Sequence, residues 1–220
     1  MKMAKLISLI GALIAVAPAF ANQPMQTSEE PVKTESIVLG GGCFWCLEPL
    51  FEMVKGVKDV EVAYAGGVPQ GASYEDVCTG QTGHAESLKI TFDPQVLSPE
   101  NLLRIFFTIH DPTTLNAQGV DHGTQYRSVI FFSSPEEKER AQKVIAEIAA
   151  AKIWPHKIVT SVEPLRNYTR AEEYHQDYYK KYEKATDYQR AQMNVSYCHA
   201  IIEPKVLHFR QKFKNLLKGS

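Results

Sequence analysis

The feature that most constrains the fold is a run of three glycines, Gly40-Gly41-Gly42, between two segments of different periodicity. Residues 36–39 (SIVL) before it are apolar, which predicts a short buried strand. Apolar residues after it recur at helical spacing over residues 43–55, which predicts a helix that contains Pro49. Because glycine permits tight turns, we predict a strand, a turn and a helix that begins at Cys43.

The position of Cys43 indicates a reactive thiol. Free N–H groups and the positive end of the dipole at a helix N-terminus stabilise a thiolate. A Cys-x-x-Cys context also lowers a thiol pKa below its usual value of ~8.5. We therefore predict that Cys43 is a nucleophile with a lowered pKa, and that Phe44 and Trp45 form an aromatic wall beside its sulfur. The alternative is a buried structural cysteine, which three consecutive glycines disfavour because they weaken a core strand.

Strand and helix patterns alternate along the rest of the chain. The expected strands are residues 57–64, 86–92, 126–132 and 158–162, and the expected helices are residues 98–110, 134–151, 170–184 and 206–217. Two strands alternate in polarity instead of being apolar throughout, which is typical of a sheet that helices cover on one face. We therefore predict an α+β fold, a two-layer α/β sandwich, with a doubly wound parallel sheet as the alternative.

The first 35 residues are predicted to lie outside the folded domain. Two lysines, an apolar run over residues 6–17 and the small-x-small site Ala19-Phe20-Ala21 are typical of a secretory signal peptide, residues 1–21. An uncleaved membrane anchor is the alternative. Residues 22–35 are polar and contain two prolines, which predicts a flexible linker. Residues 36–220, about 185 in all, suffice for a single domain with its own core.

The overall charge and the cysteine count narrow the function. A net charge of −1 gives no reason to expect binding to nucleic acid or to an anionic membrane surface. Four cysteines do not make a disulfide framework for a domain of this size, which needs no covalent staples. The Cys-x-x-Cys pair at positions 43 and 46 instead indicates redox or metal chemistry.

Two polar segments supply further candidate residues. The first, YEDVCTGQTGHAE, runs from Tyr74 to Glu86 and ends at the start of a predicted strand. A carboxyl group at such a position beside aromatic rings tends to have a raised pKa and can act as an acid. The second segment leads through Asp121 to Tyr126 and is rich in polar side chains. Taken alone, each segment could also be an ordinary turn or a structural hydrogen-bond network.

Taken together, these segments resemble one family. GCFWC, YEDVCTGQTGHAE, HDPTTLNAQGVDHGTQYRS and the later EEYHQDY are similar to motifs of the A-type peptide methionine sulfoxide reductases (MsrA). The match runs from about residue 38 to residue 179, which is nearly the whole predicted domain.

The resemblance implies a role for each matching residue. Cys43 matches the nucleophile, and Glu86 matches the acid that protonates the sulfoxide oxygen. Phe44 and Trp45 match the pocket for the methyl group, Tyr74 and Tyr126 match hydroxyls that bind the oxygen, and Asp121 matches a residue that holds the substrate by polar contacts. The resemblance also implies a ferredoxin-like sandwich, specificity for the S epimer, and no metal or organic cofactor.

The chemistry accounts for these residue types. The sulfur of a sulfoxide becomes a good electrophile once its oxygen is protonated, and only a neutral carboxylic acid can donate that proton, so Glu86 should lie in a dry site. Attack by Cys43 releases methionine and leaves a sulfenic acid, which a second thiol converts to a disulfide. A thioredoxin-like dithiol then reduces this disulfide.

The identity of the resolving thiol stays open. Cys46 is favoured because it lies one helical turn from Cys43, whereas Cys198 requires its segment to fold back. This chain departs from many relatives, which carry glycine at the position of Cys46 and a glycine-rich tail. Cys78 is expected to be a small buried hydrophobic residue.

Three histidines, His84, His122 and His175, lie within the motif segments. Together with the cysteines, these histidines could in principle form a zinc site. Their spacings match no standard zinc-binding pattern, however, and a bound metal would block the nucleophile. We expect them to support the site by hydrogen bonds.

Two other functions remain as alternatives. A general thiol–disulfide oxidoreductase also uses Cys-x-x-Cys, but would not need Glu86. A non-enzymatic envelope binding module would not need Cys43. Export, in turn, places the protein in the periplasm or outside the cell, where we expect an envelope thioredoxin-like donor, oxidised envelope proteins as substrates and a monomeric enzyme.

Overall fold

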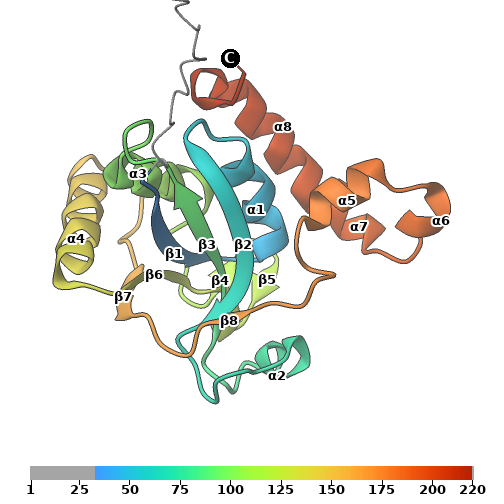
Figure 1. Ribbon diagram of the computed structural model, residues 1–220. Helices are drawn as coiled ribbons and strands as arrows, with labels where there is room; N and C mark the ends of the chain where they lie inside the picture. Colours follow the sequence, from blue (N-terminus) through green and yellow to red (C-terminus); the bar gives the residue numbers. More distant parts are fainter. Residues whose placement is uncertain (1–32, 220) are drawn as a thin grey trace, which may run out of the picture. The chain divides into compact units, whose positions relative to one another are not determined.

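The computed structural model describes residues 33–219, which are built on a six-stranded sheet of order β7-β6-β1-β3-β2-β8 (Figure 1). The strands are β1 (Glu35–Gly41), β2 (Val57–Ala65), β3 (Ala85–Phe92), β6 (Ser128–Phe132), β7 (Ser161–Pro164) and β8 (Thr169–Arg170). Neighbouring strands are antiparallel except for the parallel pair β6–β7. The predicted α+β fold is confirmed, and the alternative of a doubly wound parallel sheet is wrong. The predicted signal peptide and most of the predicted linker lie outside the described residues.

Helices and a small hairpin complete the domain. The helices are α1 (Phe44–Glu52), α2 (Tyr74–Cys78), α3 (Pro99–Ile109), α4 (Pro135–Ala150), α5 (Tyr178–Lys184), α6 (Asp187–Arg190), α7 (Val195–Tyr197) and α8 (Glu203–Lys212). A π-helical turn, Cys198–Ile202, joins α7 to α8, and 3₁₀ turns lie at Thr124–Tyr126 and Lys214–Leu216. The hairpin pairs β4 (Ala117–Gln118) with β5 (Asp121–His122). None of the helices in residues 33–219 is long and apolar enough to cross a membrane.

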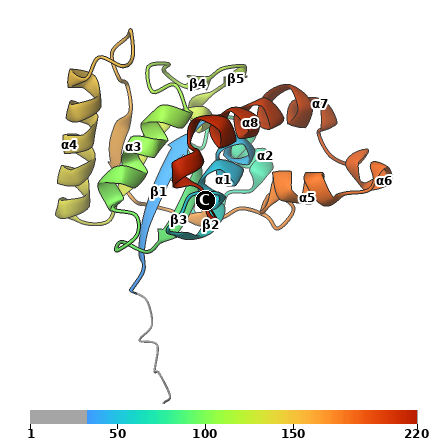
Figure 2. The same ribbon diagram turned by 90° about the horizontal axis from the view of Figure 1, so that it is seen from above.

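The alternation of side chains along β1 separates two hydrophobic clusters. Ile37 and Leu39 join the main core, which also contains apolar residues of α1, α3 and α4. Val38 joins a smaller cluster on the other face, against which Leu165 and Tyr168 pack. Helices therefore cover one face of the sheet, as predicted, and the chain after β7 covers part of the other. Helix α4 lies at the β6–β7 end and α5–α7 lie at the opposite end (Figures 1 and 2).

The two serine–proline helix starts are confirmed. The Ser98 and Ser134 hydroxyls accept hydrogen bonds from the backbone N–H groups of Asn101 and Glu137, and a proline follows each serine in the first turn. The last helix begins three residues earlier than predicted, and the strand expected at residues 158–162 begins at Ser161. Helix α2 was not predicted, although a capping box between Ser73 and Asp76 begins it.

The helix predicted over residues 170–184 is wrong in its first half. Residues 169–170 form β8, and α5 begins only at Tyr178. The side chain of Gln176 both donates to the carbonyl and accepts from the N–H of Val62 in β2, at 3.0 Å each. These two hydrogen bonds extend the pairing at the outer edge of β2, so residues 171–177 pack against the sheet and do not form a helix.

Candidate active site

Cys43 lies at the junction predicted from the glycines. It is the N-cap of α1, directly after the turn that follows β1. Gly42 has a φ of +104°, and a Cβ added there would lie 2.5 Å from Cγ of Gln118. A Cβ added at Gly41 would lie 2.7 Å from the ring of Phe106. Any larger residue would therefore displace the turn that presents Cys43.

The carboxyl group of Glu86 contacts the start of α1. It lies in β3, is 2% exposed, and accepts a hydrogen bond from the backbone N–H of Phe44 at 3.0 Å. Burial raises the pKa of Glu86 to about 8, and the Phe44 hydrogen bond opposes this shift only in part. The dry surroundings expected for an acid are therefore present, and Glu86 is mostly neutral at pH 7.

The two expected tyrosines lie around Glu86 and come from different elements. Tyr74 begins α2, and Tyr126 ends the 3₁₀ turn before β6. Burial raises the pKa of both hydroxyls, and a negative charge on Glu86 would raise them further. Both hydroxyls therefore keep their protons at neutral pH and can serve as hydrogen-bond donors.

The thiols of Cys43 and Cys46 are both buried and hydrogen-bonded to each other. Burial raises the pKa of Cys43 well above its usual value, so the predicted lowering at Cys43 is wrong for the resting pair. The neighbouring Cys46 and Glu86 add to this effect of burial, and the first N–H of α1, that of Phe44, donates to Glu86. The pKa of Cys46 is lowered instead, chiefly by the hydrogen bond from Cys43.

A residue that the sequence did not indicate completes this group. The hydroxyl of Tyr197, in α7, lies 3.3 Å from Sγ of Cys46 and donates to Oδ2 of Asp121 at 2.7 Å. Asp121 belongs to β5 of the small hairpin. The C-terminal part of the chain therefore reaches back to the thiols, and it does so through Tyr197.

Phe44 and Trp45 form part of an aromatic cluster at the start of α1. The Trp45 ring stacks on Tyr178 with ring centroids 3.9 Å apart, and its indole N–H donates to Nδ1 of His175 at 3.1 Å. The buried ring of His175 also contacts the rings of Phe44 and Tyr74, at 5.0 and 4.5 Å between centroids. His175 thus supports the site by a hydrogen bond, as expected.

Glu172 and Tyr178 were not foreseen. One Glu172 oxygen accepts from the backbone N–H of Tyr74 at 2.9 Å, and the other from the hydroxyl of Tyr64 at 2.8 Å. Both residues follow β8 in the segment that the sequence pattern assigned to a helix. They are the first and last residues of the EEYHQDY motif, which was the available signal.

Three expectations for other residues change. Cys78 is exposed and not buried, because Val77 occupies the inward position at the end of α2. His122 is exposed, and neither ring nitrogen of buried His84 has a hydrogen-bond partner among residues 33–219, so neither histidine shows the expected support. Cys198 is fully buried at the start of the π-helical turn. In residues 33–219, no group of three or more His, Cys, Asp or Glu side chains could hold a metal ion.

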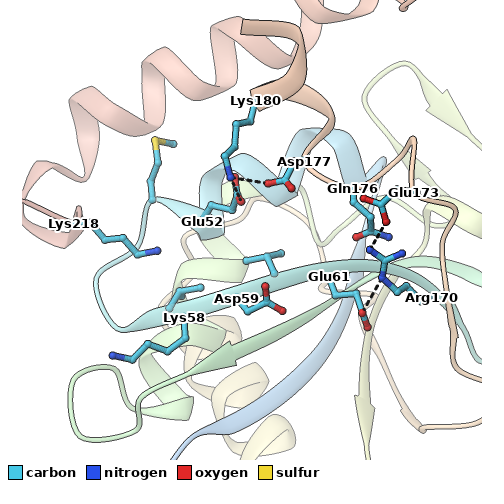
Figure 3. A pocket seen from close by; sticks show the side chains of 13 residues that line it. Glu52, Lys58, Asp59, Glu61, Arg170, Glu173, Gln176, Asp177, Lys180 and Lys218 are labelled. Carbon is cyan, nitrogen blue, oxygen red and sulfur yellow. Dashed lines mark hydrogen bonds and ion pairs between the residues drawn. The ribbon is translucent and has the colours of Figure 1, made fainter. Parts of the chain in front are cut away.

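A charged hollow of about 570 Å³ lies beside β2, apart from the thiols. Arg170 there contacts both Glu61 and Glu173, and Lys180 contacts Asp177 (Figure 3). These ion pairs neutralise part of the charge in the hollow.

Comparisons with known proteins agree with this arrangement. The family model described as "Peptide methionine sulfoxide reductase" matches residues 35–216. The chain is 48% identical over 183 residues to the peptide methionine sulfoxide reductase MsrA of Polynucleobacter asymbioticus, covering 83% of this chain and 91% of that one. It is also 48% identical to the MsrA of Granulibacter bethesdensis, covering 80% and 90%.

Solved structures show the same likeness. The reduced form of Mxr1 from Saccharomyces cerevisiae superimposes with a TM-score of 0.63 at 38% identity, covering 71% of this chain and 90% of that chain. Methionine sulfoxide reductase A of Corynebacterium diphtheriae has a TM-score of 0.63 at 34% identity, covering 72% and 79%. The chain therefore belongs to the peptide methionine sulfoxide reductase family, and it is an oxidoreductase that reduces methionine sulfoxide with electrons from thiols.

Proposed function

We propose that this reductase acts on the S epimer of methionine sulfoxide, in peptides, in proteins and as the free amino acid, through attack by Cys43 on the sulfur. The observation that carries the proposal is the contact between the start of α1 and β3. The Phe44 N–H, next in the chain to Cys43, holds a buried Glu86 whose pKa is raised to about 8. The neutral acid Glu86 is therefore hydrogen-bonded to the peptide unit that joins Cys43, the nucleophile, to Phe44.

The first step uses both groups. Glu86 donates its proton to the sulfoxide oxygen while the Cys43 sulfur attacks the sulfoxide sulfur, and the proton that Cys43 loses returns to Glu86, which is protonated again at the end of the step. The sulfur–oxygen bond of the substrate breaks, methionine leaves, and the oxygen remains on Cys43 as a sulfenic acid. The substrate sulfur is reduced and the Cys43 sulfur is oxidised, so the electrons balance.

Other side chains hold the substrate. Phe44 and Trp45 contact the methyl group, because they are the apolar rings next to the thiol. Tyr74 and Tyr126 donate hydrogen bonds to the oxygen, which requires that both hydroxyls stay protonated. Asp121 binds the substrate by polar contacts at the edge of the site.

Cys46 resolves the sulfenic acid. Its thiol is already hydrogen-bonded to Cys43, and its backbone N–H donates to the Cys43 carbonyl at 3.0 Å in the first turn of α1. Cys198, in contrast, is fully buried in the turn before α8, and burial raises its pKa to about 11. A thiol that ionises so weakly is a slow attacking group.

The decisive experiment measures reduction of the two epimers of a methionine sulfoxide peptide, with dithiothreitol as the reductant. We expect reduction of the S epimer alone, its loss in Cys43→Ser, and trapping of a sulfenic acid in Cys46→Ser. Reduction of the R epimer, or full activity of Cys43→Ser, would contradict the proposal. Rapid disulfide formation in Cys46→Ser would assign the resolving step to Cys198.

We further propose that the enzyme is exported and repairs oxidised envelope proteins, with an envelope thioredoxin-like dithiol protein as its reductant. The support is the sequence of residues 1–21, together with the inability of a cytosolic donor to cross the inner membrane. Turnover should be measured with an envelope dithiol protein and with a cytosolic thioredoxin. Turnover with the cytosolic protein alone would contradict this assignment.

The finer fold assignment is ferredoxin-like. The antiparallel order β6-β1-β3-β2, with α1 after β1 and α3 between β3 and β6, supports it. We also propose that the enzyme is a monomer, and sedimentation at micromolar concentration would test this.

A further inference from the structure

The hydrogen bonds around Cys46 have a direction that the geometry determines. The Tyr197 hydroxyl carries one proton and lies 2.7 Å from Oδ2 of Asp121, to which it donates. Because the hydroxyl has no second proton, the Tyr197 oxygen can only accept a hydrogen bond at its 3.3 Å contact with Sγ of Cys46. The thiol of Cys46 is therefore the donor, and its proton points toward Tyr197.

These bonds form a chain of proton donors. Cys46 donates to Tyr197, and Tyr197 donates to Asp121. Each group is oriented to pass its proton to the next, and the chain ends at a carboxylate. Cys46 is 2% exposed, so water has little access to the thiol and the chain is the direct route for its proton.

The resolving step needs such a route. When Cys46 attacks the sulfenic acid of Cys43, a sulfur–sulfur bond forms, and the S–H bond of Cys46 and the S–O bond of Cys43 break. The Cys43 sulfur is reduced, the Cys46 sulfur is oxidised, and the hydroxyl group leaves as water. The proton of Cys46 must therefore be removed, and the departing oxygen must receive one.

We propose that Tyr197 and Asp121 form a proton relay that acts as the base in disulfide formation between Cys46 and Cys43. Tyr197 accepts the Cys46 proton as it gives its own to Asp121, and the protonated Glu86 supplies the proton of the leaving water. Asp121 later returns its proton to solvent, and Glu86 regains one, so no net proton is consumed. This role rests on the proposed function of Cys46 as the resolving thiol.

The chain offers a matched control. Tyr182 in α5 is a second partly buried hydroxyl of the C-terminal region, but its partner is Nε2 of His199 at 2.9 Å. Tyr182→Phe therefore removes a comparable hydrogen bond without touching the thiols. Tyr197→Phe removes the relay, and Asp121→Asn keeps an acceptor oxygen for Tyr197 while removing the base.

The experiment is a single turnover with a methionine S-sulfoxide peptide in the Cys198→Ser background, with rapid quenching and quantification of methionine, sulfenic acid and disulfide. We expect methionine to form at the parental rate, within about threefold, in Tyr197→Phe. The sulfenic acid should then accumulate, because disulfide formation should slow by about 10²-fold, the usual loss when a general base is removed. Asp121→Asn should also slow disulfide formation, and Tyr182→Phe should leave both rates unchanged.

The outcomes separate the two proposals. If the parent forms no Cys43–Cys46 disulfide, the assignment of Cys46 fails. If the parent forms it and Tyr197→Phe forms it equally fast, the relay is refuted and the assignment of Cys46 stands. Equal slowing of methionine release and disulfide formation in Tyr197→Phe would also refute the relay, because it would place Tyr197 in the first step.

Discussion

Replacing Glu86 by glutamine tests how much of catalysis depends on a neutral acid. With a pKa of about 8, Glu86 is protonated in about 90% of molecules at pH 7, against about 0.3% for an ordinary glutamate. Burial thus increases the population of the acid by about 300-fold. Glutamine keeps the size of the side chain and an oxygen that accepts from Phe44, but it has no proton to give.

The assay is the rate of methionine formation in a single turnover between pH 6 and pH 10. We expect Glu86→Gln to be slower by about 10²- to 10³-fold at pH 7, as for loss of a general acid. The wild-type rate should fall above pH 8, because deprotonation removes the acid. This decline should be absent in Glu86→Gln, and Glu75→Gln, an exposed carboxyl group on α2, should behave as the wild type.

Two results would refute this reasoning. One is a Glu86→Gln enzyme within about threefold of the wild type at pH 7. The other is persistence of the decline above pH 8 in Glu86→Gln, since the titrating group would then be elsewhere.

Two further predictions concern groups behind the site. Burial raises the pKa of Glu48 to about 8 although it accepts two backbone N–H groups, so the native protein holds a proton that the unfolded chain releases between pH 4.5 and pH 8. The free energy of unfolding should therefore fall as the pH rises through this range, by up to about 1.4 kcal/mol per pH unit. Urea unfolding at pH 5 and pH 8 should show a smaller fall in Glu48→Gln than in the wild type. An equal fall in both proteins would show that Glu48 is not the group responsible. His175 accepts a hydrogen bond from the Trp45 indole, which glutamine at this position could still accept through its side-chain oxygen, whereas phenylalanine could only pack against the ring. We therefore expect kcat/KM to fall about tenfold in His175→Phe and less in His175→Gln. In NMR spectra of both variants, the indole N–H resonance of Trp45 should shift, whereas that of Trp154, which donates to the Phe107 carbonyl, should not. Higher activity in His175→Phe than in His175→Gln would instead assign His175 a packing role.

The sequence predicted the elements with strong local signals. Serine–proline pairs mark the starts of α3 and α4, and the glycines before Cys43 mark the turn between β1 and α1, because these signals depend only on neighbouring residues. It failed at residues 170–177, where tertiary contacts override helical periodicity. The side chain of Gln176 replaces a neighbouring strand, and no local pattern reveals that.

The same limit applies to the site. Cys43 and Glu86 could be placed together from motifs, but the protonation of the thiol pair could not. The helix N-terminus was expected to stabilise a Cys43 thiolate, whereas the fold gives that N–H to Glu86 and buries the sulfur. Tyr197 is 154 residues from Cys43 in the chain, and only the path of the C-terminal region brings it to the thiols.

The bonds between Gln176 and Val62 also bear on association between chains. The outer edge of β2 would otherwise present unpaired backbone groups that could template pairing with another polypeptide. One side-chain amide occupies both backbone groups of Val62, and β8 covers the next two residues. Nearer the start of the strand, Lys58, Asp59 and Glu61 line the charged hollow, and a second strand would have to desolvate them. An enzyme that acts on oxidised proteins thereby lowers its own tendency to aggregate with them.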